Sequence, residues 1–286
     1  MIQWMHLYRR LAHGPLIRRI IVFFVALLLL WAPFALVFYG VGYWTETAQL
    51  ASALALVALY GCFVGHAWYW GRWGHAWAKP FRFYGLVFCR RFAGDVVCAL
   101  GCGFGLVCFL FGTEVLMGWA TVYPKPLATI ALEGLVVGLG ISFAEELLFR
   151  GWLLSELQTG MPRFRAIVWS SMIFAIAHFI KPLSEILRTS PQFFGLLLLG
   201  LILGCWRYVH RLKPFSSLGL PIGLHAGLIW GYYIVDVADL IVPSGRVSEW
   251  VTGIHGNPLS GALGVFILGI LAIVSCLNLN LSSYSK

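Results

Sequence analysis

Two neighbouring glutamates stand in an apolar part of the chain, in the segment Phe143-Ala-Glu-Glu-Leu-Leu-Phe-Arg150. Glu146 and Arg150 are four residues apart, so on a helix they share one face and can form an ion pair with the acid on the N-terminal side. Glu145 points about 100° away from that pair, which leaves it as a carboxylate that can take a proton from water. The alternative is that all three groups only join helices.

Two histidines on later apolar segments complete the set, and the first is His178. It ends the run Phe174-Ala-Ile-Ala-His178, and the turn before that helix centres near Met161. Glu145 is sixteen residues before this turn and His178 is seventeen after it, so in antiparallel helices both lie ~24 Å from the turn. We therefore expect Glu145 and His178 to meet. A histidine that only packs inside the bundle is the alternative.

The second histidine, His225, stands between Gly223 and Gly227, which permit close approach of another helix or of a substrate chain. It lies only about two turns along its helix, which predicts a depth roughly 10 Å from that of Glu145 and His178. Helix tilt, an inserted 213–220 segment or a site recessed from the membrane face would remove this difference. A packing histidine is again the alternative.

Glu145, His178 and His225 are ionisable groups in apolar segments, so each is a candidate for a functional site. Two histidines and a carboxylate are also a ligand set for zinc or another divalent metal with one open position. No HExxH sequence occurs, which excludes the zincin arrangement. The sequence establishes no cofactor, and a metal, if present, would bind these three residues.

The composition shows which elements must position these residues. Hydrophobic residues make up 60% of the 286 residues and charged residues 11%, against roughly 25% charged in an ordinary soluble domain. The mean hydropathy is +0.85. These values exclude a water-soluble globule and predict an all-α, polytopic transmembrane bundle of about eight helices, since each apolar run can cross a hydrocarbon core of ~30 Å. The runs are 16–41, 48–70, 84–111, 132–158, 164–181, 192–209, 219–236 and 258–279.

We expect three parts within one integrated membrane domain. Helices one to three occupy 1–131, the helices that carry the site occupy 132–236, and the last helix and tail occupy 237–286. Eight crossings place both termini inside, with fifteen of the 20 basic residues on the inside and four on the outside, as expected for cytoplasmic loops. The net charge of +9 therefore reports topology, and it does not indicate nucleic-acid binding. The inside set is Arg9, Arg10, Arg18, Arg19, Arg72, Lys79, Arg82, Arg90, Arg91, Arg163, Arg165, Arg207, Arg211, Lys213 and Lys286.

The order of the site residues resembles the CPBP family, also called ABI, which includes type II CAAX prenyl endopeptidases and bacteriocin-processing or immunity proteins. The resemblance covers about 135–235. It implies an intramembrane endopeptidase in which Glu145 and His178 activate water, His225 stabilises the oxyanion, and the ion pair supports them. The matching motifs are EELLFR with Glu145, Glu146 and Arg150, FAIAH with Phe174 and His178, and GLHAG with His225.

One position departs from the family, whose last motif is usually His-x-x-x-Asn. Ile229 stands four residues after His225, and its apolar side chain cannot donate a hydrogen bond. Tyr232, about two turns beyond His225 on the same side of the helix, or a backbone N–H is the expected substitute. The chain's asparagines lie too far along to replace it locally, and they are Asn257, Asn278 and Asn280.

Three functions fit the sequence. The first is an endopeptidase that cleaves a membrane-associated or lipidated protein or peptide in the lipid bilayer. The second is an inactive CPBP-like scaffold or immunity-type protein, for which Ile229 is the argument. The third is an ion-coupled transporter, since charged groups inside a bundle also mark ion paths. In each case we expect an integral, multi-pass protein of a prokaryotic plasma membrane or of a thylakoid or organelle membrane.

Overall fold

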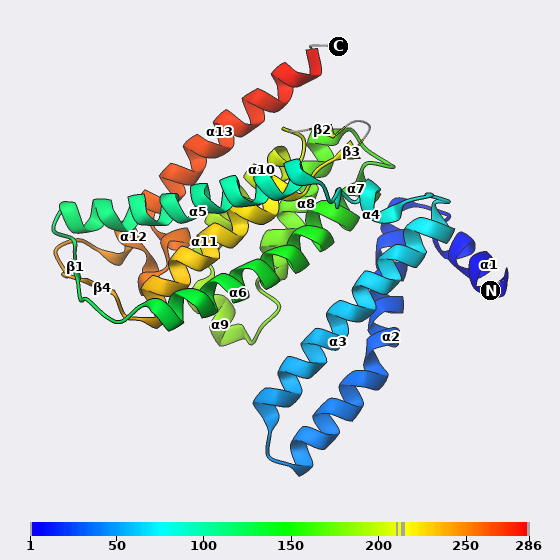
Figure 1. Ribbon diagram of the computed structural model, residues 1–286, viewed down its shortest axis with the longest axis horizontal. Coiled ribbons are helices and arrows are strands. Elements are labelled where there is room, and N and C mark those ends of the chain that lie inside the picture. Colours follow the sequence, from blue (N-terminus) through cyan, green and yellow to red (C-terminus); the bar gives the residue numbers. More distant parts are fainter. Residues whose placement is uncertain (1, 210, 213–214, 285–286) are drawn as a thin grey trace. The chain divides into compact units, whose positions relative to one another are not determined.

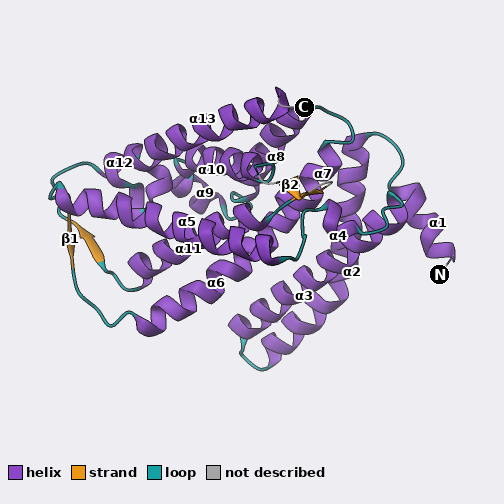
Figure 2. Cartoon of the chain, turned by 45° about the horizontal axis from the view of Figure 1, so that its top comes forward, coloured by secondary structure: helices purple, strands orange, loops and turns teal. Residues whose placement is uncertain are grey.

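The structure is a computed structural model that describes residues 2–209, 211–212 and 215–284. Lys213 and Lys286, two of the predicted inside residues, lie outside the described residues. The chain forms two compact units, one ending at Phe83 and the other beginning at Tyr84. Helices dominate both units, and the strands are short (Figure 2). The predicted all-α class is therefore confirmed.

The first unit is built on a helical hairpin. Helices α2 (Leu16–Trp44) and α3 (Ala48–Tyr69) run side by side after a short turn, and the π-helical turn η1 (Trp70–Gly74) continues α3. The N-terminal α1 (Ile2–Leu11) and the short α4 (Pro80–Phe83) complete the unit. A buried aromatic cluster holds it together. In this cluster the hydroxyl of Tyr8 is hydrogen-bonded to Nδ1 of His66 over 3.0 Å, and the rings of Phe23 and Trp70 contact His66.

The second unit carries the remaining elements (Figure 1). Its two strand pairs are both antiparallel and only two or three residues long, with β1 (Ala120–Val122) on β4 (Ile241–Pro243) and β2 (Arg211–Leu212) on β3 (Phe215–Ser216). Its helices are α5 (Arg90–Leu116), α6 (Ala128–Glu146), the π-helix η2 (Leu147–Leu153), α7 (Leu154–Leu157), α8 (Arg163–Ala177), α9 (Leu183–Thr189), α10 (Gln192–Trp206), α11 (Gly219–Val237), α12 (Glu249–Thr252), the turns η3 (Ile254–Gly256) and η4 (Pro258–Ser260), and α13 (Ala262–Tyr284).

Helix α11 runs between α5 and α6 and packs on both (Figure 1). Glycines make this possible. A Cβ added at Gly223 would lie 2.2 Å from the carbonyl oxygen of Val96, and one at Gly227 would lie 2.1 Å from that of Leu100. Small residues let helix backbones approach to this distance in membrane bundles. The two glycines around His225 therefore serve helix packing against α5, which was one of the two predicted uses.

On its other side, the second unit is closed by α10, which packs on α8 and α13. Leu199, Ile202 and Leu203 of α10, Leu224 of α11 and Leu268 of α13 form the buried apolar cluster between these helices. Because these side chains come from segments far apart in the sequence, the cluster fixes the spacing of the helices around the site.

Each of the eight predicted segments contains a helix, but not all are long enough to span a membrane. Among the described residues, six helices have the length and apolar composition for a span. Helices α8 and α10 have 15 residues each, short of the ~20 that a span requires. Helices α9 and α10 are bent by 75° and would make a seventh span if counted as one. The multi-pass bundle is confirmed, whereas the inside position of the termini stays a prediction.

Candidate active site

The glutamate pair lies at the end of α6, where the helix widens into the π-helix η2. Glu146 is fully buried, and its Oε1 accepts a hydrogen bond from Nη1 of Arg150 over 2.9 Å. Arg150 is equally buried; its Nη2 donates to the carbonyl oxygen of Gly200 over 3.3 Å, and its guanidinium stacks on Phe174 at 4.1 Å from the ring centroid. The predicted ion pair is confirmed, and it is enclosed by protein on every side.

Both histidines are held at Nδ1, which sets the direction of the rest of the ring. Nδ1 of His225 lies 2.9 Å from Oε1 of Glu146, and Nδ1 of His178 lies 2.8 Å from the carbonyl oxygen of Phe174. A carboxylate and a carbonyl can only accept, so each Nδ1 carries the proton. In the neutral ring Nε2 is then an acceptor. Both Nε2 atoms face Glu145.

Glu145 lies between the two histidines. Its Oε2 is 3.9 Å from Nε2 of His178 and 3.9 Å from Nε2 of His225. This carboxylate oxygen is buried and accepts no hydrogen bond from a described residue. A separation of 3.9 Å is too long for a direct hydrogen bond and is a distance that a water molecule can bridge. The predicted meeting of Glu145 and His178 is therefore confirmed.

The predicted depth difference of His225 does not occur, because α11 begins well inside the bundle. The residue before α11, Leu218, packs on Gly151, whose added Cβ would lie 3.5 Å from Leu218 Cδ1. His225 lies about two turns after Leu218, and Glu145 lies about two turns before Gly151 on a neighbouring antiparallel helix. The two side chains therefore reach the same level. Of the three explanations that the sequence leaves open, this agrees with an inserted 213–220 segment, of which residues 213–214 lie outside the described residues.

Arg207 holds that inserted segment in place. Its guanidinium is buried and donates to the carbonyl oxygen of Arg150, and its Nη2 donates to Oγ of Ser155 over 3.1 Å. Its own carbonyl oxygen accepts from the backbone N–H of Ser217 over 3.2 Å. Arg207, predicted as a loop cation, thus links η2 to the start of α11.

A metal fits these residues poorly as they stand. Among the described residues, no group of three histidine, cysteine or acidic side chains is arranged to hold an ion. The separation of 3.9 Å from Oε2 of Glu145 to either Nε2 is close to the sum of two zinc–ligand bonds of about 2.0–2.1 Å. An ion bonded to both atoms would therefore have an angle of roughly 140° between the two bonds, wider than the ~109° of tetrahedral geometry.

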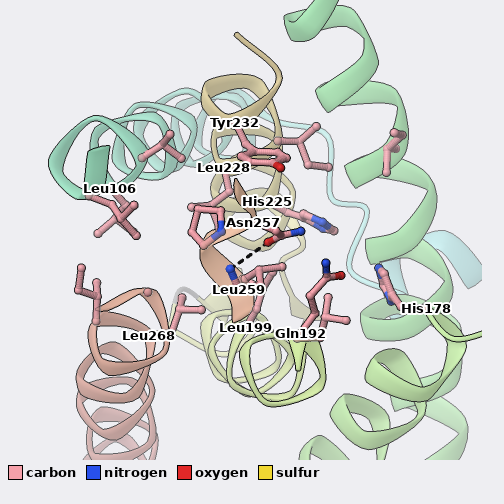
Figure 3. Close-up of a pocket in the computed structure, with 18 of the residues that line it drawn as sticks. Leu106, His178, Gln192, Leu199, His225, Leu228, Tyr232, Asn257, Leu259 and Leu268 are labelled. Atoms are coloured by element: carbon pink, nitrogen blue, oxygen red, sulfur yellow. Dashed lines mark hydrogen bonds between the residues drawn. The ribbon is translucent and has the colours of Figure 1, made fainter. Parts of the chain in front are cut away.

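The three residues open onto a cavity of about 300 Å³. Its wall is mainly apolar and comes from α5, α10, α11 and α13. Figure 3 shows His178 and His225 at one side of this cavity, with leucines around the rest. The apolar lining includes Leu106, Leu110, Leu196, Leu199, Leu228, Ile229 and Leu268. An apolar cavity with few convergent polar groups is typical of a site for a small molecule or a substrate side chain.

Two carboxamides outside the predicted set of site residues also line the cavity, Gln192 and Asn257. Asn257 lies between η3 and η4, and Gln192 begins α10. Asn257 is too far along the chain to replace the missing asparagine locally, but the loop before α13 brings it into the lining of the same cavity. Tyr232, an expected substitute for the missing asparagine, lines the cavity, and its hydroxyl donates to Oδ1 of Asp236 over 3.3 Å. No motif or spacing in the sequence indicates either carboxamide.

Comparison with known families identifies the part of the chain that carries the site. Residues 127–231 match the model for the type II CAAX prenyl endopeptidase Rce1-like family. This segment is therefore similar to the domain of that family. It agrees with the resemblance to the CPBP family, and it contains Glu145, His178 and His225 as well as the ion pair. No curated protein and no solved structure matches the chain.

The Rce1-like domain and the six candidate spans together identify the class of protein. The chain is an integral, multi-pass membrane protein, and its function is of the CAAX-type intramembrane protease kind. Such a protease acts on a membrane-embedded substrate in the lipid bilayer. Asn257 lies beyond the end of the matched domain.

Proposed function

We propose that the protein is an intramembrane endopeptidase that hydrolyses a peptide bond of a membrane-associated or lipidated protein or peptide with a water activated by Glu145 and His178. The position of Glu145 carries this proposal. Its buried Oε2, which accepts no hydrogen bond from a described residue, faces the Nε2 atoms of two histidines at 3.9 Å each, beside an apolar cavity. A buried polar atom without a partner is costly, so this oxygen favours a bound water.

The reaction begins with that water. Glu145 takes one of its protons while the water oxygen attacks the carbonyl carbon of the substrate, and the carbonyl oxygen becomes negative. His178 accepts the proton from Glu145 at Nε2 and delivers it to the amide nitrogen as the C–N bond breaks. The products are a new carboxyl terminus and a free amine. His225 faces the carbonyl oxygen. When both ring nitrogens of His225 carry a proton, its Nε2 donates a hydrogen bond that stabilises the negative charge on that oxygen.

Glu146 and Arg150 are positioning residues in this scheme. Glu146 holds the His225 ring through Nδ1, and Arg150 holds Glu146. A carboxylate on the far nitrogen of a histidine fixes its orientation in many hydrolytic sites. The scheme uses no metal step, because the distances between the three side chains do not suit a shared ion.

The apolar lining of the cavity indicates the class of substrate. An apolar wall next to the reacting groups favours an apolar side chain or a lipid-bearing residue beside the scissile bond. A membrane-embedded position also gives such a substrate direct access from the bilayer. Nucleic acid is not a partner in this proposal, since the basic residues follow the loops between apolar segments.

The test compares the native chain with Glu145→Gln in detergent and in lipid vesicles, on membrane-protein peptides analysed by mass spectrometry. The matched control is Glu133→Gln, which removes an exposed glutamate from the same helix α6. We expect cleavage products with the native chain and with Glu133→Gln, and a loss of about 10²–10⁴ in rate with Glu145→Gln.

Thermal melting of all three proteins shows whether each is folded. Equal cleavage by the native chain and a folded Glu145→Gln protein would overturn the mechanism. No cleavage by any folded form would instead favour the scaffold function, for which the apolar Ile229 in the cavity wall is the supporting observation.

A further inference from the structure

Asn257 and Gln192 are the two carboxamides in the lining of a mainly apolar cavity, next to the proposed reacting groups. In Figure 3 the amide of Asn257 points into the cavity near His225, and that of Gln192 lies on the side of His178. Polar groups that converge in an apolar cavity usually orient the ligand. The two side chains differ in how firmly they are held.

The orientation of the Asn257 amide is set by its own loop. Its Oδ1 accepts a hydrogen bond from the backbone N–H of Leu259 over 2.9 Å, as the cap of η4. Since an N–H needs an acceptor, the oxygen must occupy that end of the amide. The NH₂ group is therefore the end that remains for the cavity, and Figure 3 shows the nitrogen turned toward His225.

The loop that carries Asn257 is fixed against the helices on both sides. The carbonyl oxygen of Asn257 accepts from Oγ of Ser260 over 2.7 Å, and its backbone N–H donates to Ile254 over 3.2 Å. On α10, a Cβ added at Gly195 would lie 2.3 Å from the carbonyl oxygen of Leu259. The amide is thus presented by a loop in backbone contact with α10, which is the preorganisation that charge stabilisation requires.

The reaction needs such a donor. Nδ1 of His225 is committed to Glu146, so its Nε2 donates only when the ring carries two protons. Ile229, one turn further along α11, lines the cavity without a polar atom. An asparagine amide donates in every protonation state of the site. It would therefore stabilise negative charge whichever histidine holds the moving proton.

We propose that Asn257 is a further catalytic residue, which donates a hydrogen bond from Nδ2 to the carbonyl oxygen of the scissile peptide bond as that oxygen becomes negative. This inference rests on the proposed endopeptidase function. It means that the Rce1-like domain at 127–231 does not hold the whole site, and that the loop before α13 completes it.

The test uses two substitutions that keep the cap and remove the N–H donors. Asn257→Ser and Asn257→Asp each retain an oxygen for Leu259 at the cap position. We expect kcat to fall by about 10²–10³ with KM nearly unchanged, and we expect both proteins to melt at the temperature of the native chain. Gln192→Ala removes the other carboxamide, whose orientation no cap fixes, and is expected to lower kcat by less than about tenfold.

A rescue variant separates a chemical role from a structural one. Ile229→Asn in the Asn257→Ser background places an amide on α11 in the wall of the same cavity. We expect the kcat of this double variant to be at least about tenfold higher than that of Asn257→Ser alone. If Asn257→Ser and Asn257→Asp both keep kcat within about threefold of a native chain whose cleavage depends on Glu145, this inference is overturned and the proposed function stands. If the native chain shows no cleavage that depends on Glu145, both this inference and the proposed function are overturned.

Discussion

Each unit of the chain buries a histidine on an apolar helix, and the two are held in different ways. His66 in α3 is 2% exposed and lies among aromatic rings, with the hydroxyl of Tyr8 on its Nδ1. His225 in α11 is 5% exposed, with the carboxylate of Glu146 on Nδ1 and that of Glu145 facing Nε2. Both histidines are buried, so burial alone does not identify a functional site. The carboxylates and the adjoining cavity do.

The largest expected difference between the surroundings of His225 and those of His66 is in their contribution to stability. Arg150→Met leaves the carboxylate of Glu146 buried without its cation, and we expect a loss of about 3–5 kcal/mol in the free energy of unfolding. Denaturation in SDS or urea measures it. The control is Arg188→Met, which breaks the exposed pair with Glu185 and should cost less than about 1 kcal/mol. Similar losses in both variants would contradict the buried network around His225.

The next effect is on turnover. His225→Ala removes the ring that faces the scissile carbonyl, and we expect kcat to fall by about 10²–10³. His66→Phe keeps the size and the aromatic contacts of the other buried histidine, and we expect it to leave kcat within about twofold. Cleavage assays on the two variants test the comparison directly. A loss of kcat in His66→Phe as large as that in His225→Ala would show that burial alone is responsible.

A smaller effect is expected in the first unit. Tyr8→Phe removes the hydroxyl that is hydrogen-bonded to His66, and we expect it to lower the free energy of unfolding by about 1 kcal/mol with no change in kcat. Parallel melting and cleavage measurements would check this. A selective loss of activity would mean that the aromatic cluster takes part in function.

The smallest effect is expected from a chelator. Because the separations of 3.9 Å around Glu145 suit a water better than a tetrahedral ion, EDTA or phenanthroline should leave the rate of cleavage unchanged. Activity lost to a chelator and restored by zinc would require a rearranged site in which the same three residues bind the ion.

Local spacing in the sequence was sufficient to predict the helices, the buried ion pair and the meeting of Glu145 with His178. The eight apolar runs each contain a helix, the four-residue spacing of Glu146 and Arg150 gives their ion pair, and equal distance from one turn brings Glu145 to His178. These inferences need only helix rise and period. The expected parts 1–131, 132–236 and 237–286 stay a prediction.

The remainder of the site depends on tertiary contacts. The level of His225 is set by Leu218 against Gly151, and that of Asn257 by the close approach of Leu259 to Gly195. Neither contact has a period or motif in the sequence. Composition alone predicts full spans for the short α8 and α10, because the apolar sequence continues beyond the ends of these helices.

The glycine contacts of α11 also limit how this site can vary. Added side chains at Gly103, Gly223 or Gly227 would each meet backbone atoms within about 2.3 Å, so even a methyl group must push α5 and α11 apart. The contact between these two helices therefore does not tolerate small increases in side-chain size at these glycines. Leu196 on α10 and Ile267 on α13 line another wall of the cavity and lie outside the buried cluster that spaces the helices, so substitutions there can enlarge or narrow the cavity while the reacting groups keep their places. New substrate preferences would therefore arise by changes on that wall.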